Sequence, residues 1–186
     1  MKDINFLPLK DSIYLKKISN KSEISSKDSC EGYLIDTNEK ESRRIIDFLK
    51  GKKKILAVLG RDNSFNRRAI ETLKIDYLVS PEIGERKDTL KQKDSGLNHI
   101  IAKESAKKGI AIVIPLFEIS KIDKEKKALR LSRIAQNIKI CRRAKCEIKI
   151  ANLSEDKKNL INEIGRRSLG LSLGMSTEQA KKATNF

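Results

Sequence analysis

Apolar and polar segments alternate along the chain in a way that predicts strands and helices in turn. Strands are expected at residues 33–36, 54–60, 76–80, 110–116 and 146–153. The segment 54–60 is a near-continuous apolar run, which is typical of a strand covered on both faces. Apolar residues at helical spacing lie between these strands, at residues 41–50, 67–74, 95–108 and 125–143. A weak first strand is expected at 4–9, and Ser154 is expected to cap a further helix. This order predicts an α/β domain with a parallel sheet.

The length of the chain limits the kind of sheet that can form. The pattern gives six strands in 186 residues, whereas a full eight-unit barrel usually needs about 250 residues. We therefore expect one domain over residues 1–186, with a small or degenerate barrel. Segment 14–32 is dense in Ser, Lys, Asn and Asp, and it is expected to be a polar loop or poorly ordered.

The charge of the chain favours a polyanionic partner. Lys and Arg number 41 against 25 Asp and Glu, which gives a net charge of +16. An excess of one sign favours nucleic acid over a merely solvated surface. Aromatic residues make up only 4% of the chain, so contacts to the phosphates of folded RNA or duplex are expected rather than base stacking.

Other features of the sequence argue against membrane and secreted classes. No apolar run approaches 18 residues, and no helix combines a basic face with aromatic anchors. The N-terminal segment has an acid at position 3 and lacks the apolar region of a signal peptide. The three cysteines are irregularly spaced, which indicates reduced thiols rather than a zinc site. A cytoplasmic protein is expected.

Enzyme motifs are scarce. No glycine-rich nucleotide-binding motif follows a strand, and one histidine cannot supply the usual hydrolytic metal cluster. Four carboxylates at or just beyond strands have the oxygen ligands that Mg²⁺ prefers, although such residues more often cap helices or pair with Lys and Arg: Asp36, Asp76, Glu82 and Glu118. A stand-alone metal-dependent phosphoesterase therefore remains one alternative. A basic scaffold that binds only a protein partner is another.

The connection 81–94, between a strand and a helix, is the strongest candidate for a binding site. It contains four basic residues: Arg86, Lys87, Lys91 and Lys93. Asp94 or Ser95 is expected to cap the following helix. A helix N-terminus favours phosphate, so the loop is predicted to contact phosphate.

Two helices extend this prediction. In the helix after the loop, Leu97, Ile100 and Ile101 are expected to face the core, while His99 and Lys103 share another face. In the long helix 125–143, basic residues recur at a spacing typical of a solvated face: Lys126, Arg130 and Arg133.

Several of these segments together resemble archaeal ribonuclease P protein component 3, the relative of the eukaryotic 30-kDa subunit. The resemblance covers roughly residues 54–184. It rests on Ser80–Pro81, the segment KDSGLNH at 93–99, Ala102–Lys103, the strand Ile110–Ile114 and SLGLSLGMSTEQAKKA at 168–183.

This resemblance implies a TIM-like barrel akin to the polymerase-and-histidinol-phosphatase (PHP) superfamily, without its metal cluster. It implies a subunit of an endoribonuclease, not catalytic alone, that supports a catalytic RNA in removing 5′ leaders from precursor tRNA. Mg²⁺ is expected on that RNA, and no cofactor on the protein. The implied partners are ribonuclease P RNA and protein component 2, as a heterodimer or heterotetramer, with precursor tRNA bound indirectly.

The sequence departs from the family pattern in two places. TLKQK at 89–93 resembles an insertion, so either Arg86–Lys87–Asp88 or Lys93–Asp94 matches the family's Arg-Lys-Asp. One strand–helix unit near the N-terminus is missing. Asp88 and Asp94 are expected to hold the loop and the helix start. The residues expected to contact RNA or a partner are Arg86, Lys87, Lys93, His99, Lys103, Lys108 and Lys181.

Overall fold

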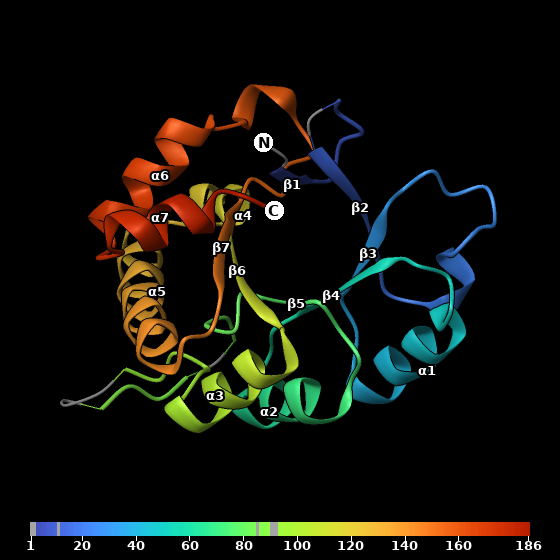
Figure 1. The fold of residues 1–186 in the computed structure, drawn as a ribbon, viewed down its shortest axis with the longest axis horizontal. Coiled ribbons are helices and arrows are strands. Elements are labelled where there is room, and N and C mark those ends of the chain that lie inside the picture. Colours follow the sequence, from blue (N-terminus) through green and yellow to red (C-terminus); the bar gives the residue numbers. More distant parts are fainter. Residues whose placement is uncertain (1–2, 11, 85, 90–92) are drawn as a thin grey trace.

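The computed structural model describes residues 3–10, 12–84, 86–89 and 93–186, and within them the chain forms an α/β barrel. Seven parallel strands follow one another around the barrel in chain order (Figure 1). They are β1 (Asp3–Asn5), β2 (Ser12–Ile18), β3 (Gly32–Ile35), β4 (Ile55–Leu59), β5 (Tyr77–Val79), β6 (Ala111–Pro115) and β7 (Ile148–Ala151).

Helices lie outside this ring of strands (Figure 1). The α-helices are α1 (Glu39–Leu49), α2 (Asn63–Thr72), α3 (His99–Lys108), α4 (Leu116–Lys121), α5 (Lys124–Ala144), α6 (Glu163–Ser172) and α7 (Thr177–Ala183). Two short 3₁₀ helices are η1 (Lys21–Glu23) and η2 (Lys157–Asn159). The predicted small α/β barrel is confirmed, and α4 is an element that the sequence pattern did not show.

The prediction for segment 14–32 is wrong at its beginning. Strand β2 occupies residues 12–18, and it brings Leu15 and Ile18 into the core. Its lysines hid the pattern, because Lys16 and Lys17 are partly covered and paired, Lys16 with Asp28 at 2.9 Å and Lys17 with Asp36 at 3.0 Å. The strand count is therefore seven and not six.

In the described residues before β3, the barrel has no α-helix. Figure 1 shows the sector beside β1 and β2 without one, and segments 6–10 and 19–31 contain only η1. The second of these segments covers β2 and β3 instead. In it, Asp28 accepts hydrogen bonds from Lys16 Nζ and, at 3.1 Å, from Tyr33 Oη. The prediction was that one strand–helix unit is missing near the N-terminus. The described residues form seven strands, with connections instead of α-helices after β1 and β2.

The barrel closes at the seam between β7 and β1 through single hydrogen bonds. The Leu153 N–H donates to the Ile4 carbonyl at 3.2 Å, and the Ser154 N–H donates to Asn5 Oδ1 at 2.7 Å. No strand ladder joins β7 to β1 within the described ranges. Ser154 serves this seam and does not cap a helix. The prediction for Ser154 is wrong, because α6 begins later, capped by Asn162.

A buried ion pair reinforces the same seam. Asp3 pairs with Arg166 of α6, and its carboxylate also accepts a hydrogen bond from the Asn152 N–H at 3.3 Å. Burial raises the pKa of Asp3, while Arg166 and Asn152 oppose that shift. Helix α6 is thereby held against the end of the barrel.

Apolar side chains form two layers of core. The inner layer fills the barrel and contains Ile4, Leu15, Leu34, Ala57, Leu59, Val79, Val113, Ala151 and Leu153. The outer and larger layer lies between the strands and the helices, and it includes the buried cysteines Cys30, Cys141 and Cys146. No helix in the described part of the chain has the length and apolar character needed to span a membrane.

Candidate functional site

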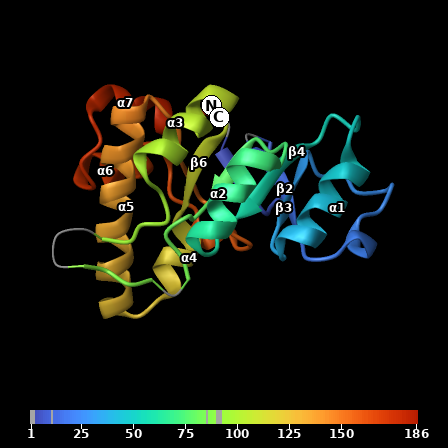
Figure 2. The same cartoon turned by 90° about the horizontal axis from the view of Figure 1, so that it is seen from below.

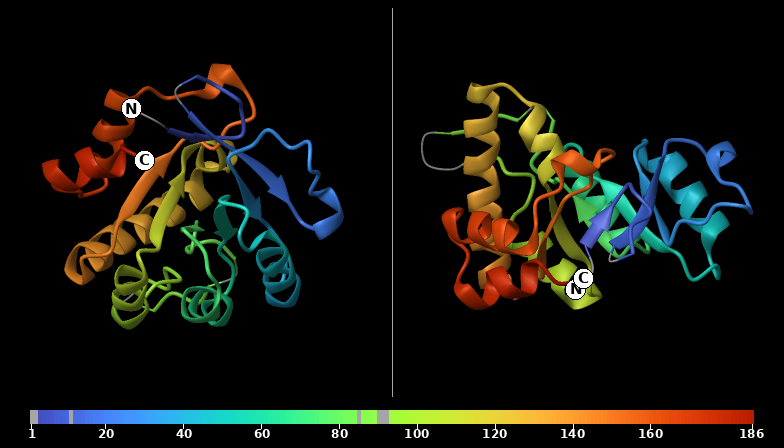
Figure 3. Two further views of the ribbon diagram at one scale, coloured as in Figure 1. Left: turned by 45° about the vertical axis from the view of Figure 1, so that its right-hand side comes forward. Right: turned by 90° about the horizontal axis from the view of Figure 1, so that it is seen from above.

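The connection between β5 and α3, residues 80–98, is called here the β5–α3 loop. It leaves the carboxyl end of β5 and runs along α5 (Figures 2 and 3). Lys91 and most of the expected insertion fall on residues 90–92, outside the described residues. Arg86, Lys87 and Lys93 are among the described residues.

Two glycines allow the ends of the loop to pass close to other backbone. At Gly96, with φ of 74°, a Cβ atom would lie 1.8 Å from the Pro81 carbonyl oxygen. At Gly60, directly after β4, a Cβ atom would lie 2.6 Å from the Ser80 carbonyl oxygen. Any larger residue at these two positions would force the backbone apart, because no Cβ approaches other atoms so closely.

Asn66 of α2 joins the two ends of the loop. Its buried side-chain amide donates to the Pro81 carbonyl at 2.9 Å and to the Gly96 carbonyl at 3.2 Å. Its Oδ1 accepts from the Arg61 N–H at 2.8 Å. One asparagine therefore satisfies a backbone group near each end of the loop and one after β4.

Arg86 lies inside the loop, and this differs from the expected exposed contact. Its side chain is 1% exposed. The guanidinium donates to the carbonyls of Arg61, Pro81 and Ile83, and it pairs with Asp94 at 3.1 Å. In this conformation Arg86 stabilises the loop, and it does not present its charge to solvent.

Arg130 of α5 supports the beginning of the loop. Its Nε donates to Glu82 at 3.0 Å, and its Nη2 donates to the Ser80 hydroxyl at 2.8 Å. The side chains of Arg130 and Glu82 are 12% and 1% exposed. Ser80 has a φ of 52°, a conformation that a non-glycine residue keeps only when its surroundings impose it.

Further along α5, three side chains hold the middle and end of the loop. Arg133 pairs with Asp88 at 3.2 Å. The Gln136 amide donates to the Lys93 carbonyl at 2.7 Å, and the Asn137 amide donates to the Ser95 carbonyl at 3.0 Å. The expected solvated face of α5 is thus wrong at Arg130 and Arg133, which are almost buried.

Asp88 and Asp94 hold the loop in place, as the sequence predicted. Asp88 accepts from the Asp94 N–H at 2.7 Å, and Asp94 accepts from the Asn63 amide at 3.0 Å. Burial alone would raise the pKa of both carboxyls. Hydrogen bonds and the neighbouring guanidiniums of Arg133 and Arg86 outweigh it, so both pKa values lie below the ordinary range.

The start of α3 differs from the prediction. Asn98 caps the helix through a 2.9 Å hydrogen bond from the Ile101 N–H, so neither Asp94 nor Ser95 is the cap. Leu97 and Ile101 are buried as expected, but Ile100 is 77% exposed. The helix begins about one turn later than the periodicity suggested, because Gly96 has a φ of 74°, which is not helical, and Asn98 caps the helix after it.

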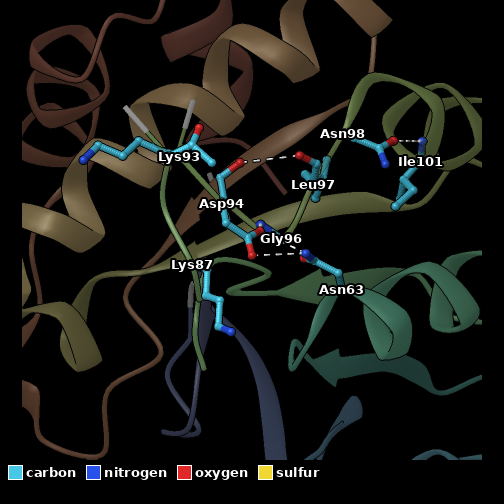
Figure 4. A pocket seen from close by; sticks show the side chains of 10 residues that line it. Asn63, Lys87, Lys93, Asp94, Gly96, Leu97, Asn98 and Ile101 are labelled. Carbon is cyan, nitrogen blue, oxygen red and sulfur yellow. Dashed lines mark hydrogen bonds between the residues drawn. The ribbon is translucent and has the colours of Figure 1, made fainter. Parts of the chain in front are cut away.

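A cavity of about 260 Å³ lies between the loop and the start of α3 (Figure 4). Lys87, Lys93 and Asn98 are among its lining residues, and the two lysine side chains point in different directions from it. His99 and Lys103 are exposed on α3. The first turn of a helix leaves N–H groups without helical partners, so lysines beside it create a surface suited to anionic groups such as phosphate.

Two other expected contact residues lie elsewhere. Lys108 is at the far end of α3, where its Nζ donates to the Ile70 carbonyl at 3.0 Å and pairs with Glu104 at 3.4 Å. Lys181 is exposed on α7, which packs on β7 and α6. Of the expected contact residues, Lys87 and Lys93 line one cavity, and His99 and Lys103 are exposed on the helix that begins beside it. We call Lys87, Lys93 and Lys103 the loop-face lysines.

The carboxylates considered for metal binding are spread among separate partners. Asp36 pairs with Lys17 and Arg61, and Glu82 and Glu118 pair with Arg130. Asp76 accepts a hydrogen bond from the Leu56 N–H at 2.8 Å. Across the described ranges, no three His, Cys, Asp or Glu side chains gather in a way that would hold a metal ion.

The sequence reasoning missed the asparagines that hold the loop. Asn66 follows Phe65 and precedes Ala69 and Ile70 on the buried face of α2. Asn137 likewise lies between buried Ile134 and Ile138 in α5. A polar amide on the apolar face of a helix was the available signal, because such a group is buried only when it has partners.

Fold and site together define a TIM-like α/β barrel with a fixed, basic loop at the carboxyl end of β5. Two solved structures share this fold. One is an amidohydrolase, with a TM-score of 0.58 and 12% identity over 84% of this chain and 41% of that chain. The other is a Xaa-Pro dipeptidase with bound methionine, with a TM-score of 0.60 and 14% identity over 85% of this chain and 43% of that chain. No family model matches the sequence. The chain is related to archaeal ribonuclease P protein component 3.

Matches to two curated relatives support this relationship. Component 3 of Thermococcus gammatolerans is 31% identical over 134 residues, which are 72% of this chain and 59% of the relative. Component 3 of Methanothermobacter thermautotrophicus is 26% identical over 56% of this chain and 40% of the relative. The chain thus spans between two fifths and three fifths of the length of these two relatives.

A solved structure agrees in fold. A chain in the cryo-EM structure of archaeal ribonuclease P with mature tRNA matches with a TM-score of 0.70 and 22% identity. The match covers 91% of this chain and 76% of that one. At this identity the likeness shows the shared barrel, which the two chains keep over nearly the whole of the present one.

Proposed function

We propose that the chain is a protein subunit of ribonuclease P that supports the catalytic RNA in removing 5′ leaders from precursor tRNA. The observation that carries this proposal is the sequence relationship to component 3 over 134 residues. In this proposal the RNA holds the catalytic Mg²⁺, the chain binds no cofactor, and the protein works in the cytoplasm. Its protein partner is component 2, and precursor tRNA is bound through the assembly.

The loop face is the proposed RNA contact. The loop-face lysines are exposed. Lys87 and Lys93 line the cavity at the start of α3, and Lys93 is also 3.8 Å from Asp88. Ammonium groups placed in this way can neutralise phosphates. His99 lies in the same turn with its imidazole exposed, and it is proposed to donate a hydrogen bond to RNA. Arg86 is proposed to act indirectly, by keeping the loop in shape.

Reconstitution of precursor-tRNA cleavage tests the proposed function. An archaeal ribonuclease P RNA with component 2 is assayed at low Mg²⁺ with and without the chain, and the chain is assayed alone. We expect the chain alone to be inert and its addition to raise cleavage. Phosphoester hydrolysis by the chain alone would favour the phosphoesterase alternative, and the absence of any effect on cleavage would contradict the subunit role.

A matched pair of variants tests the loop face. One variant changes all three loop-face lysines to Gln. The other changes three exposed lysines for which the structure records no ion pair: Lys124, Lys139 and Lys157. Both remove three charges. The loop-face variant is expected to weaken RNA binding about tenfold or more at low salt, and the control variant several-fold less. Equal losses would show that net charge alone is responsible.

A further inference from the structure

A second group of lysines lies at the opposite end of the barrel. The turn between α1 and β4, residues 50–54, has the sequence KGKKK, and Lys74 precedes β5. Lys50, Lys52, Lys53 and Lys74 are exposed. Within the described ranges none of these four forms an ion pair, whereas most arginines of the chain do.

Three of these lysines, Lys50, Lys53 and Lys74, line a hollow and do not form a flat solvated face. β4 and β5 are neighbours in the sheet, so the turns that lead into them lie side by side. A cavity of about 300 Å³ opens there, with Leu49, Leu56 and Leu73 among its lining residues. Its basic residues include Lys50, Lys53, Lys54 and Lys74, which we call the lysine groove.

A second cavity, of about 590 Å³, continues this hollow. It shares Lys54, Leu56 and Lys74 with the first and extends to Lys108. The acidic side chains along it are already engaged: Glu71 pairs with Arg67 at 2.7 Å, and Asp76 accepts from the Leu56 N–H. Six basic and three acidic side chains line the two cavities. Arg43 and Lys108 are paired with Glu39 and Glu104, so the excess positive charge of the hollow comes from the lysine groove.

The same turn carries a further cation beside an aromatic ring. Lys52 Nζ lies 4.0 Å from the ring centroid of Phe48, and Lys21 Nζ of η1 lies 4.2 Å from it. Phe48 is 38% exposed. Cation–π attraction to the Phe48 ring holds two ammonium groups beside the turn 50–54, although like charges repel at this range. An anion placed there would relieve that repulsion.

We propose that the lysine groove is a second binding site for an RNA phosphate backbone. It lies at the amino ends of the strands, whereas the β5–α3 loop lies at the carboxyl end of β5 (Figure 2). Five residues of β4 separate the two ends by roughly 17 Å, so the two sites contact different segments of RNA. The identity of the ligand as RNA rests on the proposed function.

The test uses a groove variant in which Lys50, Lys53 and Lys74 become Gln. It is compared with the wild type, the loop-face variant and the three-lysine control. Affinity of the full chain for a transcribed archaeal ribonuclease P RNA is measured against salt concentration, and hydroxyl-radical footprints locate the protected backbone. The three positions are exposed, so we expect thermal unfolding of this variant to match that of the wild type within a few degrees.

For the groove variant, we expect the magnitude of the slope of log K against log salt to fall by about two to three. Protection from hydroxyl radicals should be lost at nucleotides that the loop-face variant still protects. A slope equal to that of the control would overturn the groove as a site. Loss of the same nucleotides in both variants would overturn a second site.

Failure of the groove is distinguishable from failure of the proposed function. If the wild type binds and the loop-face variant weakens while the groove variant does not, only the groove proposal fails. If the wild type does not bind this RNA, both fail. If RNA binding persists while binding of component 2 is lost, the groove contacts protein and its assignment to RNA is wrong.

Discussion

At the carboxyl end of β5, Arg86, Arg130 and Arg133 are nearly buried, and each is bonded to carbonyls or carboxylates of the β5–α3 loop and its surroundings. At the amino ends, Lys50 and Lys53 remain exposed around a hollow. The planar guanidinium presents five donors in a fixed arrangement, which suits a loop full of carbonyl groups. The ammonium group is compact and strongly hydrated, so it stays at the surface. The positive charge of this chain therefore includes buried arginines that hold a loop and exposed lysines that line a hollow. Only the structure distinguishes the two groups.

The largest expected effect concerns the buried arginine. Arg130→Met leaves Glu82 buried without its partner, and removing one member of a buried pair typically costs about 3–5 kcal/mol. The matched exposed change, Arg67→Met, breaks the surface pair with Glu71 and should cost less than about 1 kcal/mol. Urea unfolding of both variants measures the difference.

A double variant checks the reason for this cost. If Glu82 is unstable because it is charged and unpaired, Arg130→Met combined with Glu82→Leu should recover much of the lost stability. A double variant that is no more stable than Arg130→Met would show that packing, and not charge, holds the start of the loop.

The barrel was predictable because its strands are apolar runs. Strands β4 and β6 are covered on both faces, and their hydrophobic sequences indicate this burial. Strand β2 was not predictable, because its lysines are paired with aspartates distant in sequence. The loop was recognisable as a candidate site from its charge and its motif. The burial of Arg86 was not recognisable, because its partners are backbone carbonyls that any sequence possesses.

The second expected effect tests the close approach inside the loop. Gly96→Ala would place a Cβ atom 1.8 Å from the Pro81 carbonyl oxygen at a φ of 74°. Strained backbone and overpacking together should cost about 2–4 kcal/mol. Gly109 has a φ of 71° with open space around it, so Gly109→Ala should cost only about 1 kcal/mol.

Urea unfolding and limited proteolysis within residues 80–98 measure both variants. Faster cleavage of the loop is expected in Gly96→Ala alone. Equal effects of the two substitutions would mean that the backbone conformation, and not the contact with Pro81, determines the cost.

A smaller effect is expected at the start of α3. Asn98→Ala removes the N-cap and should cost about 1 kcal/mol, as should Asn162→Ala at the start of α6. Only Asn98 lies beside the loop-face lysines, so only its substitution should weaken RNA binding, by a few-fold. Equal weakening by Asn162→Ala would remove the start of α3 from the proposed contact.

The smallest expected effect is a dependence on pH that should appear at the β5–α3 loop and not at the lysine groove. The pKa values of Asp88 and Asp94 lie below the ordinary range, so their ionised forms stabilise the folded loop. That stabilisation is complete above the unfolded pKa of about 4, and it is lost as the pH falls through the lower folded values. Hydrogen exchange of the loop amides between pH 6 and pH 3, corrected for intrinsic rates, should therefore show opening below about pH 4. Asp88→Asn should reduce this dependence.

Amides around the lysine groove provide the internal control, because Asp88 and Asp94 do not line its cavities. Their protection should not follow the loop transition. Opening of the loop as the pH rises, instead of as it falls, would mean that the protonated carboxyls are the stabilised forms. Arg86 and Arg133 would then not hold the loop by charge, and the contrast between buried arginines and exposed lysines would have to be explained by packing alone.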